Sequence, residues 1–224
     1  MTTRQLFSST ATHASEYATS RLGFGQSTSP GLQSLDIAVE VRIVTPEPDP
    51  NIGLGSPFAC GVRVQQVWDA RLFPAAIRID AITFFNNFHQ SAESYIDPAH
   101  YRFFLSVTDT TSDTITADFE ANYGRRVEEV AEMTVVGTST GFSDGAFGTL
   151  TLELTKPFRY DPRKGNLLLE IQKDQSSCDG DGPIYVDGSS NADGVTLVTQ
   201  EFGIFPHFGM TVGFDGKLHG GGND

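Results

Sequence analysis

Hydrophobic and polar residues alternate along much of this chain. Between residues 148 and 154 (Gly-Thr-Leu-Thr-Leu-Glu-Leu) every second residue is apolar, and from Leu167 to Ile171 the chain is almost continuously apolar. An alternation with period two predicts a half-buried β-strand, and a short apolar run bounded by turn residues also fits a strand. These two segments therefore predict neighbouring antiparallel strands.

The connection between these strands is rich in turn-forming residues. Pro157 is expected to end the first strand, and residues 160–166 (Tyr-Asp-Pro-Arg-Lys-Gly-Asn) to turn the chain. Pro162 restricts its own φ, Gly165 tolerates a positive φ, and Asn166 can hydrogen-bond locally. These requirements of backbone geometry explain the residues better than a binding site does.

The same pattern recurs along the chain and predicts an all-β fold. Regions of alternating strands and amphipathic helices are missing, so a parallel α/β sheet is not expected. The spacing of the strands indicates an antiparallel β-sandwich of jelly-roll type. Strands are expected at residues 35–44, 58–68, 76–86, 101–108, 127–137, 147–154, 166–172, 195–202 and 208–214, with weaker candidates at 114–117 and 184–187.

The chain is expected to form one domain with two irregular ends. Its 224 residues suffice for a single sandwich with a substantial core. We place the sandwich at residues 35–217 and a flexible tail at 218–224. Residues 1–34, rich in Ser, Thr, Ala and Gly, form an N-terminal arm, either a mobile terminus or an arm used in assembly. Residues 46–50 (Pro-Glu-Pro-Asp-Pro) predict a stiff connector.

Charge and hydropathy exclude two classes of partner. The formal net charge is −13 and the pI about 4.6, and Arg125-Arg126 is the one basic pair that stands out. Such a chain repels phosphate backbones, so nucleic-acid binding is not expected. No run of 18 apolar residues occurs, so no membrane span is expected.

These features alone do not determine the cellular compartment. Met1 is not followed by the apolar run of a secretory signal peptide. The protein is then either intracellular or an exported protein whose leader has been replaced. Cys60 and Cys178 either form one disulfide, which favours an oxidising compartment, or are two separate buried thiols.

Three segments resemble bacterial exported β-sandwich proteins of the PEP-CTERM (exosortase-sorted) type. Residues 62–73 (VRVQQVWDARLF) are similar to the group's R-x-Q-Q-V-Y…F strand, with Val64 and Trp68 replacing aromatic residues. Residues 118–124 (DFEANYG) are similar to its F-x-x-N-x-G connection. Residues 157–171 (PFRYDPRKGNLLLEI) are similar to its P-F-x-Y-[DN]-P-x-x-G-N-L-L-L-[DE]-[IV] turn and strand.

The resemblance implies a β-sandwich and export, and it carries no catalytic or ligand residue. The sorting tail of this group, Pro-Glu-Pro followed by an apolar helix and a basic end, is missing; Pro46-Glu47-Pro48 stands in the wrong place. The expected location is therefore secreted or extracellular, with the leader absent from this chain.

An acidic loop is the first candidate for a ligand site. Residues 174–183 (DQSSCDGDGP) offer carboxylates and flexible glycines, which suit calcium, with Asp179, Asp181 and Asp187 as the expected ligands. The spacing does not follow the twelve-residue EF-hand loop, and the alternative is a solvated acidic turn. The five histidines show no zinc-binding spacing.

Aromatic and acidic residues suggest three further roles. Trp68, if exposed with tyrosines, would stack on sugar rings. The adjacent rings of Phe84-Phe85 and Phe103-Phe104 point to opposite faces of a strand, so one of each pair lies under a loop or in a subunit contact. Alternation predicts solvent-facing carboxylates, rather than a glycosidase pair, at Glu128, Glu129, Glu132, Glu153 and Glu170.

Together these features predict a protein without catalytic residues. We expect a structural or adhesive subunit of an extracellular matrix, filament or surface layer, with a second copy of the chain or a polysaccharide as partner. A carbohydrate-binding module is the alternative, and a glycan-active hydrolase is the third possibility.

Overall fold

The computed structural model describes residues 39–54, 58, 61–86, 96–136, 148–175 and 186–218. Within these residues the regular elements are β-strands and two short 3-10 turns, and every strand pairing is antiparallel. The prediction of an all-β antiparallel sandwich is confirmed.

Three sheets contain all of these strands. A four-stranded sheet has the order β1 (Val39–Thr45), β13 (Val212–Leu218), β4 (Ile77–Phe85) and β7 (Thr149–Tyr160). A six-stranded sheet has the order β11 (Gly203–Pro206), β10 (Val195–Thr199), β3 (Arg63–Trp68), β8 (Asn166–Lys173), β5 (His100–Thr108) and β6 (Arg126–Thr134). A small sheet joins β12 (Gly209–Met210), β9 (Val186–Ser189) and β2 (Asp49–Leu54), and the 3-10 turns are η1 (Ala70–Leu72) and η2 (Pro162–Lys164).

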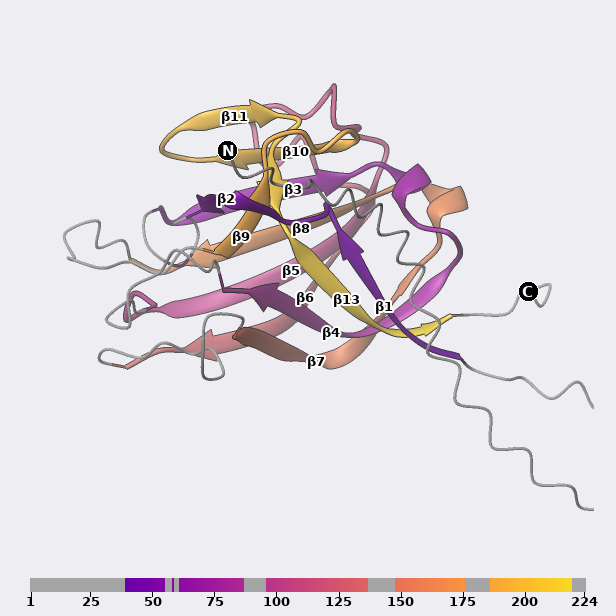
Figure 1. The fold of residues 1–224 in the computed structure, drawn as a ribbon, viewed down its shortest axis with the longest axis horizontal. Coiled ribbons are helices and arrows are strands. Elements are labelled where there is room, and N and C mark those ends of the chain that lie inside the picture. The colour runs from indigo at the N-terminus through magenta and orange to yellow at the C-terminus, as the bar shows by residue number, and fades with distance from the viewer. Residues whose placement is uncertain are drawn as a thin grey trace, which may run out of the picture. The chain divides into compact units, whose positions relative to one another are not determined.

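The four- and six-stranded sheets face each other across the main core (Figure 1). The ring of Trp68 on β3 meets Phe214 on β13 edge to face, with centroids 5.2 Å apart. In another part of the core, the ring centroids of Phe84 on β4 and Phe103 on β5 lie 6.2 Å apart. Buried apolar rings and branched side chains from both layers thus form a continuous sandwich core.

One side of the sandwich is closed, and the other is open. Edge strands β6 and β7 lie side by side: the Thr155 hydroxyl donates a 3.1 Å hydrogen bond to the Val130 carbonyl, and Lys156 Nζ lies 2.9 Å from Glu128. At the opposite edges, β1 pairs with β13 and β11 pairs with β10, and neither has a second strand partner among the described residues.

The strand β7 does not end at Pro157 as expected. It runs on to Tyr160, and its pairing with β4 is interrupted between the Glu153 and Phe158 positions. Proline cannot donate to a ladder and is accepted at such irregularities. The interruption turns residues 154–157 toward β6, where they close that side of the sandwich.

Some boundaries differ from the sequence prediction. Residues 114–117 form turns instead of a strand. The connector predicted at residues 46–50 ends in β2, and the hairpin strand β11 was not predicted. At β2, pairing with the distant strand β9 decides the conformation, and local alternation does not show it.

Several predicted features lie outside the described residues. They are the arm at residues 1–34, the tail after Leu218, and both Cys60 and Cys178. The disulfide and the jelly-roll connectivity remain predictions. No helix among the described residues has the length and hydropathy to cross a membrane.

Candidate functional site

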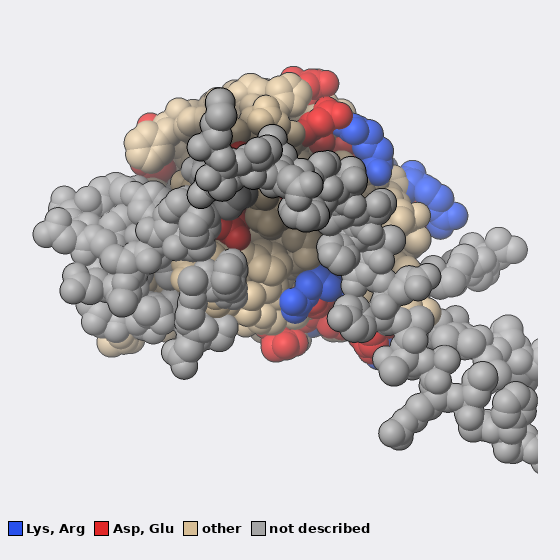
Figure 2. Space-filling view, viewed as in Figure 1, with Lys and Arg blue, Asp and Glu red and all other residues tan. Residues whose placement is uncertain are grey.

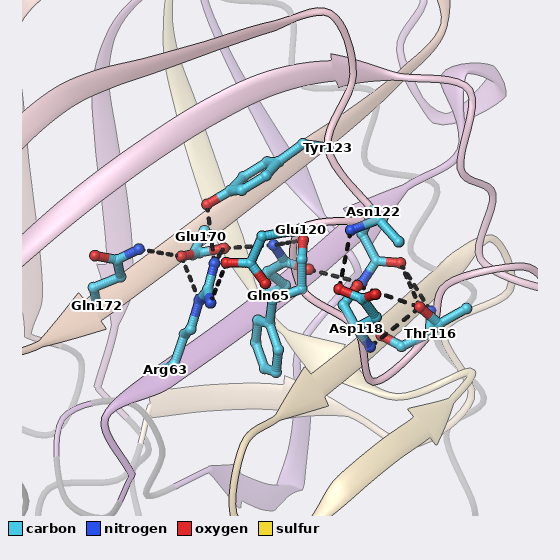
Figure 3. A network of polar contacts seen from close by, with 11 residues as sticks. Arg63, Gln65, Thr116, Asp118, Glu120, Asn122, Tyr123, Glu170 and Gln172 are labelled. Atoms are coloured by element: carbon cyan, nitrogen blue, oxygen red, sulfur yellow. Dashed lines mark hydrogen bonds and ion pairs between the residues drawn. The ribbon is translucent and has the colours of Figure 1, made fainter.

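The connection between β5 and β6 packs on the outer face of the six-stranded sheet. It forms a small second core, in which Ile115 and Phe119 meet Val67 and Val198 of the sheet. Charged and amide side chains continue this contact toward β8 (Figure 3). We call these side chains the outer-face network: Arg63, Gln65, Glu120, Asn122, Tyr123, Glu170 and Gln172.

Glu170 lies at the centre of the outer-face network and is fully buried. Arg63 Nε and Nη2 lie 2.8 and 3.3 Å from its two carboxylate oxygens. The side-chain amides of Gln65 and Gln172 also donate to this carboxylate. Four donors around one buried charge satisfy its hydrogen-bonding capacity, which is the condition for burying it at acceptable cost.

Asn122 ties the connection to the sheet. Its amide nitrogen donates to Gln65 Oε1 and to the Thr116 carbonyl, both at 2.8 Å, and its side-chain oxygen accepts from the Thr116 N–H at 2.9 Å. Gln65 in turn donates to the Phe119 carbonyl at 2.9 Å. An amide can serve as donor and acceptor at once, which suits Asn122 to this position.

The electrostatics of the network favour the charged states of Arg63 and Glu120. Burial acts to lower the pKa of Arg63, but hydrogen bonds to Glu170 and Glu120 outweigh it, so this pKa is raised. The hydrogen bond from Arg63 lowers the pKa of Glu120. Burial, followed by the interaction with Glu170, raises the pKa of Tyr123 to about 12. Arg63 and Glu120 are therefore held as a charged, hydrogen-bonded pair.

A second buried ion pair lies in the main core. Lys173 Nζ is 2.9 Å from Asp97 Oδ2, and both side chains are almost fully buried. The Tyr101 hydroxyl donates to the Asp97 carbonyl at 2.9 Å, and burial raises the pKa of Tyr101. The pair joins the end of β8 to the segment that enters β5, so we assign it a structural role.

Gly124 marks the point where the connection returns to the sheet. A Cβ atom built there would lie 1.7 Å from the Val107 carbonyl oxygen, a backbone atom that cannot move alone. The Gly124 N–H donates to the Ser106 hydroxyl at 3.0 Å. Only glycine permits this close approach.

The variant Gly124→Ala is expected to lose about 1–3 kcal/mol of stability, the usual cost of overpacking. Gly213→Ala is the matched control, because its Cβ would meet other atoms at no less than 3.4 Å. Urea unfolding monitored by circular dichroism measures both. If Gly124→Ala were as stable as Gly213→Ala, the connection between β5 and β6 would be able to move away from Val107 without loss of stability.

An open cleft of about 560 Å³ lies between the end of β1 and the β9–β10 connection. Apolar side chains that include Leu72 and Ala192 form part of its wall. The polar residues along it are Thr45, Glu47, Asp49, Ser189, Asn191 and Asp193. Asp193 is already paired with Arg71 at 2.8 Å.

Only one of the three predicted calcium ligands lies among the described residues. Asp179 and Asp181 lie outside the described residues, and Asp187 is half-buried on β9. Across the described ranges, no group of three or more His, Cys, Asp or Glu residues is arranged to hold a metal ion. The calcium site therefore stays a prediction.

Trp68 is not a sugar-binding residue. Its side chain is fully buried between the sheets, and its Nε1–H donates to the Thr45 carbonyl at 3.0 Å. The prediction failed because Trp68 alternates onto the inner face of β3, where Phe214 covers it. The prediction of solvent-facing carboxylates was wrong for Glu170 and for Glu128, which is 8% exposed.

The rings of each phenylalanine pair lie on opposite faces of their strand, as predicted, and the predicted loop or subunit contact of one member stays a prediction. Phe84 and Phe103 are fully buried, whereas Phe85 and Phe104 are half-buried on the other faces of their strands. The guanidinium of Arg102 lies 4.8 Å from the ring centre of Phe104 and covers part of it.

The buried core of the outer-face network was missed from sequence. Gln65, Asn122 and Glu170 carry ordinary polar side chains, and nothing in the local pattern shows that the loop containing Asn122 covers Gln65 and Glu170. The one available signal was Asn122 and Gly124 within the segment at residues 118–124, which the resemblance had singled out.

No protein-family model matches this chain, and neither a curated protein nor a solved structure matches it. The resemblance to PEP-CTERM-type proteins therefore stays a prediction.

Proposed function

We propose that this protein is a non-catalytic structural or adhesive subunit of an extracellular matrix, filament or surface layer. The observation that carries the proposal is the open side of the sandwich. Edge strands expose unpaired backbone groups, and soluble proteins usually protect them. Here large apolar side chains stand exposed beside both edges: Val39 and Val44 on β1, and Phe202 and Ile204 at β11.

The hairpin of β10 and β11 is the more exposed of the two edges. Phe202 is 62% exposed and Ile204 42% exposed. The surface over this hairpin, at the upper edge of Figure 2, is mostly uncharged. Since exposed apolar patches mark interaction sites, we assign the hairpin to a subunit contact.

The buried charges support a structural role over a catalytic one. Glu170 is held by four hydrogen-bond donors, and Asp97 by Lys173. A catalytic carboxylate needs access to substrate, and both of these carboxylates are buried. A scaffold instead needs its loops fixed, which is what these contacts achieve.

The alternative of sugar binding has weaker support. Trp68 is buried, and none of the described residues that line the open cleft is aromatic. The export of the protein rests on the sequence resemblance alone.

Assembly is tested by sedimentation and electron microscopy over a range of concentrations. We expect the intact chain to form particles or fibres whose size grows with concentration. The double variant Phe202→Asp/Ile204→Lys should require at least tenfold higher concentration, because two charges would be buried in the contact. Val127→Asp, at an exposed valine on β6, is the matched control and should assemble normally. An intact chain that stays monomeric throughout would overturn the proposal.

A further inference from the structure

Among the described residues, the edge strand β1 lacks the proline, bulge, short length and inward-pointing charge that commonly protect an edge. It is seven residues long and pairs with β13 in continuous register from Val39 to Thr45. Natural edges are blunted by proline, bulges, short length or inward-pointing charges. The residues of β1 that pack toward the core are apolar, and Pro46 comes only after the strand. By contrast, β11 has four residues and includes Pro206.

The two faces of β1 carry different residues. Val41 and Ile43 pack against the main core and are half-buried, and Val39, which shares their face by alternation, is 47% exposed. Glu40 and Arg42 point to the opposite face. Residues 39–43 therefore read apolar–acidic–apolar–basic–apolar, with Val41 at the centre of these five.

The charged residues of β1 continue a pattern that begins on β13. Glu40 is opposite Lys217, with 2.8 Å between their charged atoms, and Arg42 is opposite Asp215 and paired with it. Each row across the two strands thus joins a positive and a negative side chain.

We propose that β1 pairs antiparallel with β1 of a second copy of this chain, around a two-fold axis at Val41. This inference deepens the proposed function by naming the partner at one of the two edges. A two-fold axis makes the contact isologous, so each copy offers the same strand. The sheets of the two copies then join into one eight-stranded sheet, since each contributes four strands.

Charge complementarity selects this register. Residues opposite each other share a face, so a slip of one residue would place apolar side chains on the polar face. With Val41 on the axis, Glu40 lies opposite the second copy's Arg42 on both sides of the axis. The charges then alternate across four strands: Lys217, Glu40, Arg42 and Asp215.

The two neighbouring registers that keep the faces matched are unfavourable. Centring the axis on Glu40 places two carboxylates opposite each other, and centring it on Arg42 places two guanidinium groups opposite each other. Like charges directly opposite destabilise a strand pair. The register at Val41 also brings Val39 opposite Ile43 of the second copy, which covers the exposed apolar side chain.

Disulfide trapping tests the contact at one atom pair. Val41→Cys is made with Cys60→Ser and Cys178→Ser, which remove the two native thiols. Residues directly opposite have Cβ atoms about 4.5–5.5 Å apart, close to disulfide geometry. We expect a disulfide-linked dimer under mild oxidation, at a yield at least tenfold above that of Ile43→Cys in the same background.

Ile43→Cys is the matched control, because two copies of residue 43 would be four residues apart along the strands, roughly 13 Å. A mixture of Val39→Cys and Ile43→Cys chains should cross-link with each other. If the serine background fails to fold, the same variants are made with the native cysteines, and mass spectrometry identifies the linked peptides.

The outcomes separate this inference from the proposed function. Particles that assemble while Val41→Cys links no better than Ile43→Cys would overturn the β1 contact alone. A linked dimer of the Val41→Cys variant that never grows larger would support the contact and overturn the role as an assembly subunit. A monomer that neither links nor assembles would overturn both.

Discussion

Replacing Glu170 with alanine is expected to cost about 3–5 kcal/mol of stability, the usual penalty for removing one partner of a buried ion pair. Arg63 would keep its contacts to Glu120, Tyr123 and the ring of Phe119. The amides of Gln65 and Gln172 would lose this acceptor. The connection between β5 and β6 should loosen before the rest of the fold, because it is held through these side chains.

Urea unfolding measures the total loss, and limited proteolysis at residues 109–125 measures the local one. Glu120→Ala is the matched control: Glu120 contacts the same Arg63 at 2.7 Å, but its side chain is 72% exposed. An ion pair this exposed to solvent contributes little to stability. If Glu170→Ala were as stable as Glu120→Ala, the outer-face network would not hold the connection.

Trp68→Ala should be the most destabilising substitution in the core, at about 3–5 kcal/mol. It removes the largest of the fully buried side chains, its contact with Phe214, and the hydrogen bond to Thr45. Trp68→Phe keeps a ring and loses mainly the hydrogen bond, so a smaller loss of about 1 kcal/mol is expected for that step. Phe202→Ala, at a 62% exposed ring, should stay within about 0.5 kcal/mol of the parent.

Thermal and urea unfolding by circular dichroism compares these variants. The parent chain has one tryptophan, so its fluorescence reports on Trp68 alone. The emission should be blue-shifted in the folded protein and move to longer wavelength on unfolding. A red-shifted emission from the folded protein would place Trp68 at the surface and would again favour the prediction that it stacks on sugars.

The candidate site could be predicted only in part. The segment at residues 118–124 stood out through Asn122 and Gly124, but its docking partners did not. Gln65 and Glu170 lie 105 positions apart in sequence and meet because β3 and β8 are adjacent strands. Alternation correctly placed Glu170 on the outer face of β8. The exposure predicted for Glu170 was wrong because the connection between β5 and β6 covers that face.

What the sequence determined by itself was the class of the fold, the turn between β7 and β8, and the inner and outer faces of the strands. These depend on period-two alternation and on the backbone preferences of proline and glycine, which act over a few residues. Burial of Trp68 and Glu170, the extension of β7 past Pro157, and the open edges at β1 and β11 were decided only by the tertiary structure. Each depends on which distant segment covers a given face or edge, and such long-range packing leaves no local periodic signal.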